Sequence, residues 1–299
     1  MNGRQLREFG TRGIGGIAAD DFRYFFDCLN QAACDFVRET AALTNVVDIT
    51  IAAEQAVYDL PHDFLALYAK DKRRRLVAKY ETEDTVYWPV CSTYEKIFRA
   101  NKTDAQDVPA RFAILDADVQ SDPVTGTATG DGTAASGLAR LTDASADFVS
   151  ASVAPGDLIA NDTDGSDGVV IAVNSASALD AALFGGTRND WATGDAYTLS
   201  PLPRARIVLD GPPSTDGHTL TLPYLAKPAP IYHDLGMWRF DPASCRAIAF
   251  EGAYIYKNDY DLDTDADAHL HLFYLNEVRR KKVDMARNLL QAGRYPERR

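Results

Sequence analysis

The predicted fold is decided by residues 204–226, which read RARIVLDGPPSTDGHTLTLPYLA. Hydrophobic side chains alternate with polar ones in two runs, at Ile207 and Leu209 and again at Leu220 and Leu222. The residues between these runs are rich in Gly, Pro, Ser and Asp. Alternation on both sides of such a turn is typical of a β-hairpin with a moderately long loop. We therefore predict two antiparallel strands here.

The strand that precedes this hairpin ends where the composition of the chain changes. Residues 109–114, PARFAI, have strand character, and strand character resumes only at Arg204. Because loop tips between strands tolerate inserted domains, we predict such an insertion. Residues 1–115 and 201–299 are the two parts of a host domain, and residues 116–200 are an inserted acidic β-domain.

Charge supports the same division. Residues 116–200 contain thirteen Asp but only two bases, Arg140 and Arg188, so they carry −11 of the chain's net charge of −12. The rest of the chain carries −1. Two parts that differ this much in charge are most simply two domains. The chain has no run of the roughly 18–20 apolar residues that a membrane span needs, so we expect no membrane partner.

The host domain reads as largely helical. Asp20 and Asp21 precede apolar residues at helical spacing, and a second helix start is Asp241-Pro242, with Asp as N-cap and Pro in the first turn. A last helix follows an acidic segment. In residues 116–200, short runs punctuated by Gly, Asp and Thr predict a barrel or sandwich. The predicted fold class is α+β: a helical-bundle host domain with a β-hairpin or small sheet, interrupted by a small all-β domain.

Two basic clusters are candidate contacts. The first is a predicted hairpin tip that fits either a solvated turn or a contact for an acidic partner or DNA phosphate, and its bases are Lys70, Lys72, Arg73, Arg74 and Arg75. The second is the end of the chain, with Arg279, Arg280, Lys281, Lys282, Arg287, Arg294, Arg298 and Arg299. Bases at the end of a helix also complement its dipole, so part of this cluster has a structural reason.

The predicted β-domain offers weak ligand sites. Asp162, Asp164 and Asp167 have the oxygen spacing of a Ca²⁺ turn, but they also lie in an ordinary Asp-Gly hairpin signal, so we expect no metal. Trp191, with Asn189 and Asp190, is either a core residue or the aromatic face of a carbohydrate site. The chain carries no nucleotide-binding loop, nucleophile elbow or zinc spacing, so we expect neither a cofactor nor an enzyme.

The order of the pieces resembles the head-to-tail adaptor proteins of tailed bacteriophages, also called connector or head-completion proteins. The resemblance rests on YDLPHDF at 58–64, PARFAI at 109–114, IVLDGPP at 207–213 and LTLPYL at 220–225, followed by two C-terminal helices with an acidic joint. It covers about 1–115 and 201–299. The inserted segment departs from the simplest members of the family.

The resemblance implies a structural virion protein. Such adaptors form a ring, usually of twelve copies, between the portal protein and the tail or nozzle protein, and they line part of the DNA channel. Their C-terminal segment typically reaches toward the portal, which corresponds here to the basic residues from Arg279 onward. We therefore expect a location at the portal–tail junction of the virion. The alternatives are a surface, decoration or receptor-binding module acting through residues 116–200, and an enzyme built on scattered carboxylates.

Overall fold

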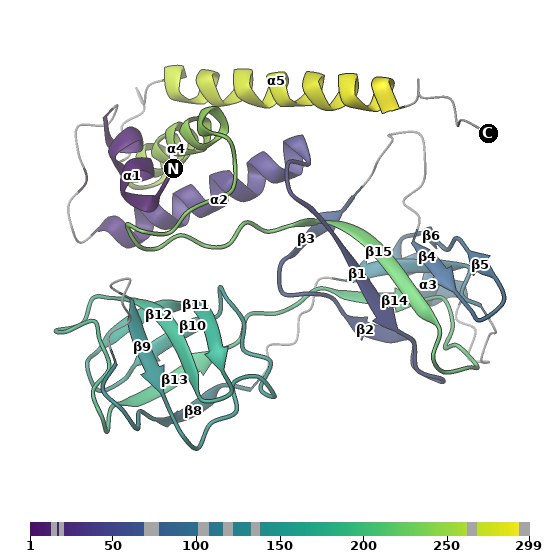
Figure 1. The fold of residues 1–299 in the computed structure, drawn as a ribbon, viewed down its shortest axis with the longest axis horizontal. Helices are drawn as coiled ribbons and strands as arrows, with labels where there is room; N and C mark the ends of the chain where they lie inside the picture. The colour runs from purple at the N-terminus through teal and green to yellow at the C-terminus, as the bar shows by residue number, and fades with distance from the viewer. Residues whose placement is uncertain are drawn as a thin grey trace. The chain divides into compact units, whose positions relative to one another are not determined.

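The computed structural model describes residues 1–12, 17, 21–68, 78–100, 108–115, 122–132, 138–261 and 268–292 (Figure 1). The chain divides into two compact units. The helix–sheet unit comprises residues 1–42, 122–201 and 228–299, and the two-sheet unit comprises residues 43–121 and 202–227. Each unit has its own hydrophobic core.

Four α-helices of the helix–sheet unit pack around one core. They are α1 (Gly3–Thr11), α2 (Phe22–Thr40), α4 (Pro242–Tyr256) and α5 (Ala268–Ala292), and a π-helical turn at Lys257–Asp261 follows α4. The apolar positions that predict α2 are indeed buried, among them Phe25, Leu29 and Phe36. Asp241 caps α4, as its sequence predicts, by accepting hydrogen bonds from the backbone N–H groups of Ala243 and Ser244.

A curved, antiparallel six-stranded sheet completes this unit. Its spatial order is β8 (Val124–Thr127), β13 (Ala196–Ser200), β10 (Leu158–Asn161), β11 (Ser166–Ser175), β12 (Ala178–Phe184) and β9 (Ala139–Thr142). An isolated bridge between Gly130 and Thr142 joins the segment after β8 to β9 at the other end of the order. The side chains inside the curve include Phe148, Trp191 and Tyr197. Phe184 also contacts the ring of Tyr232, with centroids 6.2 Å apart.

The second unit consists of two sheets around a shared core. One sheet contains β1 (Thr44–Thr50), β15 (Thr219–Ala226), β4 (Lys79–Glu81) and β5 (Val86–Tyr87), and β3 (Phe64–Leu67) also pairs with β15. The other contains β2 (Val57–Asp59), β14 (Arg206–Leu209), β7 (Arg111–Leu115) and β6 (Val90–Cys91). The short helix α3 (Tyr94–Ala100) lies between β6 and β7 in the chain. Tyr80 and Leu220 of the first sheet and Phe112 and Ile207 of the second fill the core.

The predicted hairpin at residues 204–226 is wrong, because its two strands belong to different sheets. β14 pairs with β2 and β7, whereas β15 pairs with β1, β3 and β4. The turn between them therefore crosses from one sheet to the other. Both strands direct their apolar side chains into the shared core, and this produces the same alternation that a hairpin would show.

The predicted fold class is also wrong, because the host domain is not a helical bundle with a small sheet. Two complete sheets lie in residues 43–115 and 202–227, and the described chain is built mainly from strands in three sheets. Most strands of these two sheets are only two to five residues long, so they carry little periodic signal. Their partners are also distant in the sequence, as in the pairing of Thr44 with Leu225.

The chain leaves and re-enters the second of these sheets at adjacent positions. Leu115, the last residue of β7, pairs with Arg206, the first residue of β14. A segment between two such ends can be long without disturbing the sheet. The boundaries proposed at 116 and 200 stay a prediction.

Candidate functional site

The bases of α5 hold this helix against its neighbours. Lys281 Nζ lies 2.5 Å from Asp241 Oδ2 at the start of α4, and the guanidinium of Arg280 lies 3.7 Å from the same carboxylate. Lys282 pairs with Glu39 of α2. Three of the predicted partner-binding bases, at positions 280 to 282, thus make contacts within the protein.

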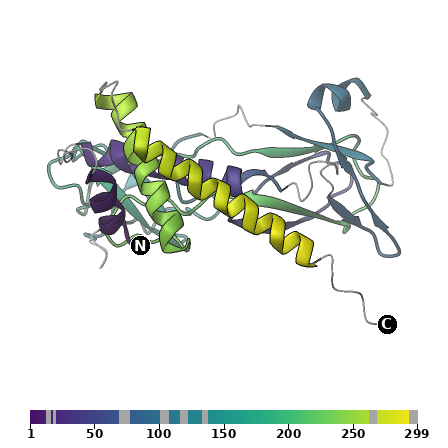
Figure 2. The same ribbon diagram turned by 90° about the horizontal axis from the view of Figure 1, so that it is seen from above.

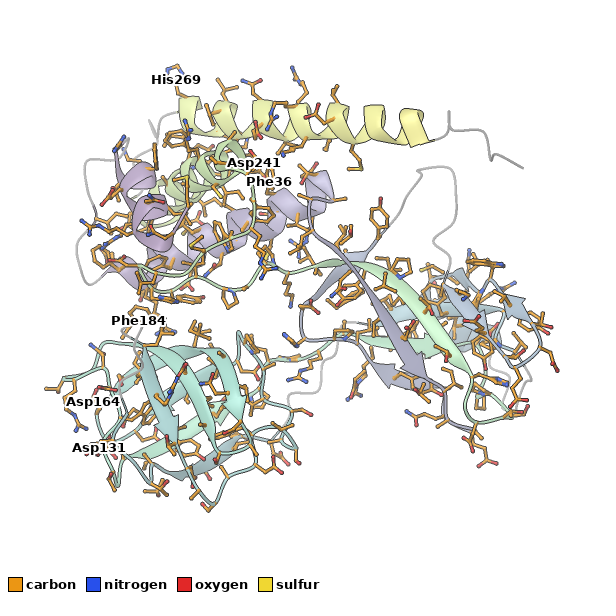
Figure 3. The ribbon with its side chains drawn as sticks, in the orientation of Figure 1. Phe36, Asp131, Asp164, Phe184, Asp241 and His269 are labelled. Atoms are coloured by element: carbon orange, nitrogen blue, oxygen red, sulfur yellow. The ribbon has the colours of Figure 1, made fainter. Side chains whose placement is uncertain are left out.

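Asp241 is the centre of this anchoring network (Figure 3). Its carboxylate accepts hydrogen bonds from Lys281, from the hydroxyl of Ser244 at 2.7 Å and from two backbone N–H groups. Burial by itself would raise the pKa of Asp241, but the hydrogen bonds from Lys281 and Ser244 outweigh burial, so the pKa lies well below its usual value. The carboxylate is therefore charged, and it joins α4 to α5.

The remaining predicted bases divide into exposed and undescribed residues. Arg279 is exposed, and it makes no ion pair with any residue that the structure describes. The side chain of Arg287 and residues Arg294, Arg298 and Arg299 lie outside the described part. So do Lys70, Lys72, Arg73, Arg74 and Arg75 of the predicted hairpin tip.

The outward face of α5 carries exposed apolar side chains beside polar and basic ones. Leu272, Leu275 and Val283 have 52%, 44% and 44% of their surface exposed, and Arg279 lies among them in the helical repeat. The opposite face is buried, and Tyr274 there contacts Phe36 of α2 with ring centroids 6.2 Å apart. Figure 2 shows α5 lying across α4. We call the exposed row of Leu272, Leu275, Arg279 and Val283 the α5 stripe. The two leucines of this stripe are visible in the sequence, but the sequence alone draws attention to the basic residues that follow them.

A buried acid pairs with a histidine beside this helix. Glu251 of α4 lies 2.8 Å from Nδ1 of His271, and the ring of Tyr254 stacks on that histidine. Burial raises the pKa of Glu251, and the contact with His271 only partly offsets the rise. His269, at the start of the same helix, is exposed (Figure 3). The pair fixes the start of α5 on α4.

The acidic residues of the curved sheet form a loop-fixing network. Asp164 accepts hydrogen bonds from the backbone N–H groups of Arg188 at 3.0 Å and of Asn189 at 2.9 Å. The guanidinium of Arg188 reaches both Asp164 and Asp195. Burial alone would raise the pKa values of the two acids, but these hydrogen bonds lower them below their usual value. The network orders the turns at one end of the sheet.

The positions of Asp162, Asp164 and Asp167 bear on whether these residues could share a calcium ion. The carboxylate of Asp164 faces N–H donors, Asp162 Oδ2 accepts from the hydroxyl of Thr198 at 2.9 Å, and Asp167 is exposed on β11. In the described ranges, no three His, Cys, Asp or Glu side chains are placed to share a metal ion. The three aspartates do not form a common site.

Trp191 is a core residue, so its ring cannot serve as the face of a carbohydrate site. Only 3% of its surface is exposed, and its ring meets the ring of Tyr197 edge-on at 6.2 Å. The neighbouring side chains support the same turn, since Asp190 accepts from the backbone of Trp191 and Asn189 from that of Gly186. Of the two interpretations of Trp191, the structure supports the core residue.

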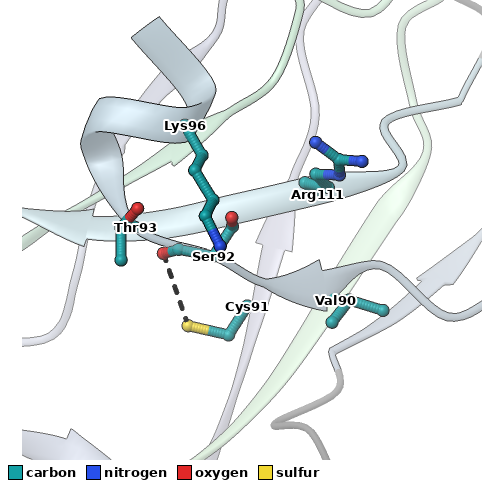
Figure 4. A pocket seen from close by; sticks show the side chains of 6 residues that line it. All are labelled: Val90, Cys91, Ser92, Thr93, Lys96 and Arg111. Atoms are coloured by element: carbon teal, nitrogen blue, oxygen red, sulfur yellow. Dashed lines mark hydrogen bonds between the residues drawn. The ribbon is translucent and has the colours of Figure 1, made fainter. Parts of the chain in front are cut away.

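Sequence reasoning missed a cationic pocket in the two-sheet unit. Its volume is about 680 Å³, and its lining comes from β6, α3 and β7: Val90, Cys91, Ser92, Thr93, Lys96 and Arg111 (Figure 4). Lys96 extends toward Ser92, and Arg111 projects from β7 beside it. The residues just before Val90 include Tyr87 and Trp88, whose exposed fractions are 39% and 61%. No local sequence motif predicts the pocket, because its two bases come from separate elements.

No protein family model and no curated protein matches this sequence. None of the helices that the structure describes combines the length and hydropathy of a membrane span.

Proposed function

We propose that this chain is a structural adaptor that joins the head of a tailed bacteriophage to its tail. In this role it assembles as a ring, the twelve-copy ring of the family it resembles, between the portal protein and the tail or nozzle protein. Genomic DNA passes through the ring without sequence-specific contact. The motif order described above supports the class of protein, and the α5 stripe supports its mode of attachment.

The α5 stripe is the single observation that carries the proposal. Apolar side chains that gather on one exposed helix face often mark a site where a partner docks, and the stripe places three of them around Arg279. An amphipathic helix that offers residues three, four and seven positions apart is a common element of protein docking. Here the inner face of the helix is fixed by the core and by Asp241, so the outer face is presented by a rigid support.

The charges of α5 then have two separate tasks. Arg280 and Lys281 anchor the helix through ion pairs with Asp241, and Lys282 does so through Glu39. Arg279 stays available to a partner, together with the bases that follow α5 in the sequence. The portal contact thus combines apolar area from the α5 stripe with charge from Arg279 and the C-terminal arginines. An acidic portal surface would attract these bases and speed the encounter.

Substitution of the stripe tests this proposal. The variant Leu272→Ser/Leu275→Ser should lose at least tenfold in affinity for assembled portal rings, measured by co-sedimentation, while its circular dichroism spectrum is unchanged. The matched control is Val46→Ser, which alters an equally exposed side chain in the two-sheet unit. Full portal binding by the stripe variant would contradict the proposal.

The two other function classes have less support. The receptor-binding alternative depended on an exposed Trp191, and that side chain is buried. For the enzyme alternative, the perturbed carboxylates Asp164, Asp195 and Asp241 each hold a turn or a helix start. No specific observation favours either alternative over the adaptor.

A further inference from the structure

We propose that the cationic pocket and the exposed Tyr87 and Trp88 form a docking surface for a second copy of this chain, and that the acidic curved sheet of that copy occupies it. The inference rests on the proposed ring, and it names the two surfaces that meet between neighbouring subunits. We call Tyr87, Trp88, Lys96 and Arg111 the pocket patch.

The two bases of the pocket are available to a partner. Lys96 and Arg111 make no hydrogen bond or ion pair through their side chains with the residues that the structure describes. Other bases of the same unit behave differently, since Lys79 pairs with Glu81 and Arg206 pairs with Asp59. Two unpaired cations in a concave surface, with the hydroxyls of Ser92 and Thr93 in the same wall, suit carboxylate groups.

The aromatic side chains give this surface the composition of a protein interface. Trp, Tyr and Arg are the residues that most often dominate binding between proteins, especially where they surround a pocket. Trp88 is the most exposed aromatic residue that the structure describes, and it is two positions from the pocket wall at Val90. Val86, 40% exposed, extends the apolar area along β5.

The curved sheet offers the complementary charge. Both of its bases are neutralised internally, Arg140 by Asp180 and Arg188 by Asp164 and Asp195. Among the residues described, five exposed carboxylates of this region make no ion pair, and they are Asp122, Asp131, Asp147, Asp162 and Asp167. A second copy of the chain therefore carries an acidic surface that fits a cationic pocket.

This contact joins two different surfaces, so it is heterologous. The pocket patch belongs to the two-sheet unit and the acidic surface to the helix–sheet unit. Each copy can then offer one surface to each of two neighbours, and such a contact closes into a ring when the rotation permits. A subunit with a damaged pocket patch keeps its acidic surface and can still accept one neighbour.

Sedimentation velocity on the full-length protein tests the contact. Wild-type chains should self-associate with increasing concentration, whereas Lys96→Glu/Arg111→Glu and Trp88→Ala should each shift the dissociation constant at least tenfold upward. Lys227→Glu and Val46→Ala are the controls, and they should behave as wild type. A mixture of wild type with the charge-reversed variant should end in short complexes, because the variant can fill only one side of the contact.

Three outcomes would overturn the inference. The first is a wild-type protein that stays monomeric at every concentration up to its solubility limit. The second is self-association that the pocket-patch variants leave unchanged. The third is self-association that survives the fourfold charge reversal of the acidic surface at Asp122, Asp131, Asp162 and Asp167 to Lys. Binding of a fluorescent single-stranded oligonucleotide that depends on Lys96 and Arg111, without an effect on self-association, would assign the patch to nucleic acid instead. The same pocket-patch variants should still bind portal rings through α5, so failure of this contact is distinct from failure of the adaptor function.

Discussion

Lys281 Nζ and Asp241 Oδ2 lie 2.5 Å apart, across forty residues of sequence, and this contact joins the last helix to the start of α4. The same carboxylate caps α4, so one side chain both begins a helix and positions the next. The bases that sequence reasoning assigned to a partner are thus divided. Some of them fix α5 to the rest of the helical core, and the α5 stripe on the outer face of that helix is the candidate contact.

Substitution of Asp241 should separate its two tasks. Asn keeps the capping oxygen but loses the ion pair, which is partly open to solvent, so Asp241→Asn should lower the free energy of unfolding by about 1 kcal/mol. Ala loses the cap as well, and Asp241→Ala should lower it by about 2 kcal/mol. Urea unfolding at pH 7 measures both values, with Asp234→Asn as a surface control. Equal losses in the two variants would contradict the double role.

The contribution of Asp241 should also depend on pH. Because its pKa is lower in the folded protein than in the unfolded chain, the charged carboxylate stabilises the fold above the usual Asp pKa of about 4. This stabilisation is lost as the pH falls from that value toward the lower folded pKa. The difference in melting temperature between wild type and Asp241→Asn should therefore be present at pH 7 and shrink as the pH falls below about 4. A difference that grows on acidification would refute the assignment.

Truncation of two tryptophans should change the stability of the protein by very different amounts. Trp191 lies in the core of the curved sheet, so Trp191→Ala should destabilise the protein by about 3–5 kcal/mol. Trp88 is exposed, and Trp88→Ala should change the stability of the monomer by less than about 0.5 kcal/mol. Thermal unfolding followed by circular dichroism measures both. A large loss for Trp88→Ala in dilute protein would mean that this ring supports the fold and is not a contact residue.

Removal of a buried hydroxyl should stabilise the helical core. Among the residues described, none provides a hydrogen-bond partner for the hydroxyl of Tyr274, although the side chain is buried between α5, α2 and α4. An unsatisfied buried hydroxyl costs free energy, so Tyr274→Phe should raise the free energy of unfolding by about 1 kcal/mol. Chemical denaturation measures the gain, with the exposed Tyr24→Phe for comparison. A loss of more than about 1 kcal/mol would reveal a partner for this hydroxyl.

Deletion of residues 293–299 should weaken attachment to the portal and leave the fold intact. This segment carries Arg294, Arg298 and Arg299, and its loss leaves Arg279 as the one remaining base of the proposed contact. The truncated protein should melt at the wild-type temperature but complete fewer heads in an in vitro assembly assay. Head completion at the wild-type level would remove these arginines from the contact.

The sequence predicted the parts of the fold that have strong local signals. The aromatic row of α2, including Phe25 and Phe36, has helical spacing, and Asp241-Pro242 carries its own capping chemistry. The two sheets were missed because their strands are short and pair over long distances, as β1 and β15 do. The hairpin prediction failed because Ile207 and Leu220 alternate toward a core that two sheets share.

The candidate surfaces, too, could be predicted only where the signal is local in the sequence. A run of bases such as Arg279–Lys282 is visible in the sequence, but which of them are free depends on Glu277, Glu39 and Asp241 as partners. The pocket around Lys96 and Arg111 arises only when β6, α3 and β7 come together. Exposure of Trp88 and burial of Trp191 were equally undetermined, because both lie in irregular segments between short strands.

Cryo-electron microscopy of the assembled virion tests the central claim most directly. The account predicts a ring of this chain at the junction of portal and tail, with the α5 stripe against the portal and the pocket patch against the curved sheet of the neighbouring subunit. Density for this chain on the capsid surface or in the tail fibres, with no copy at the junction, would contradict it.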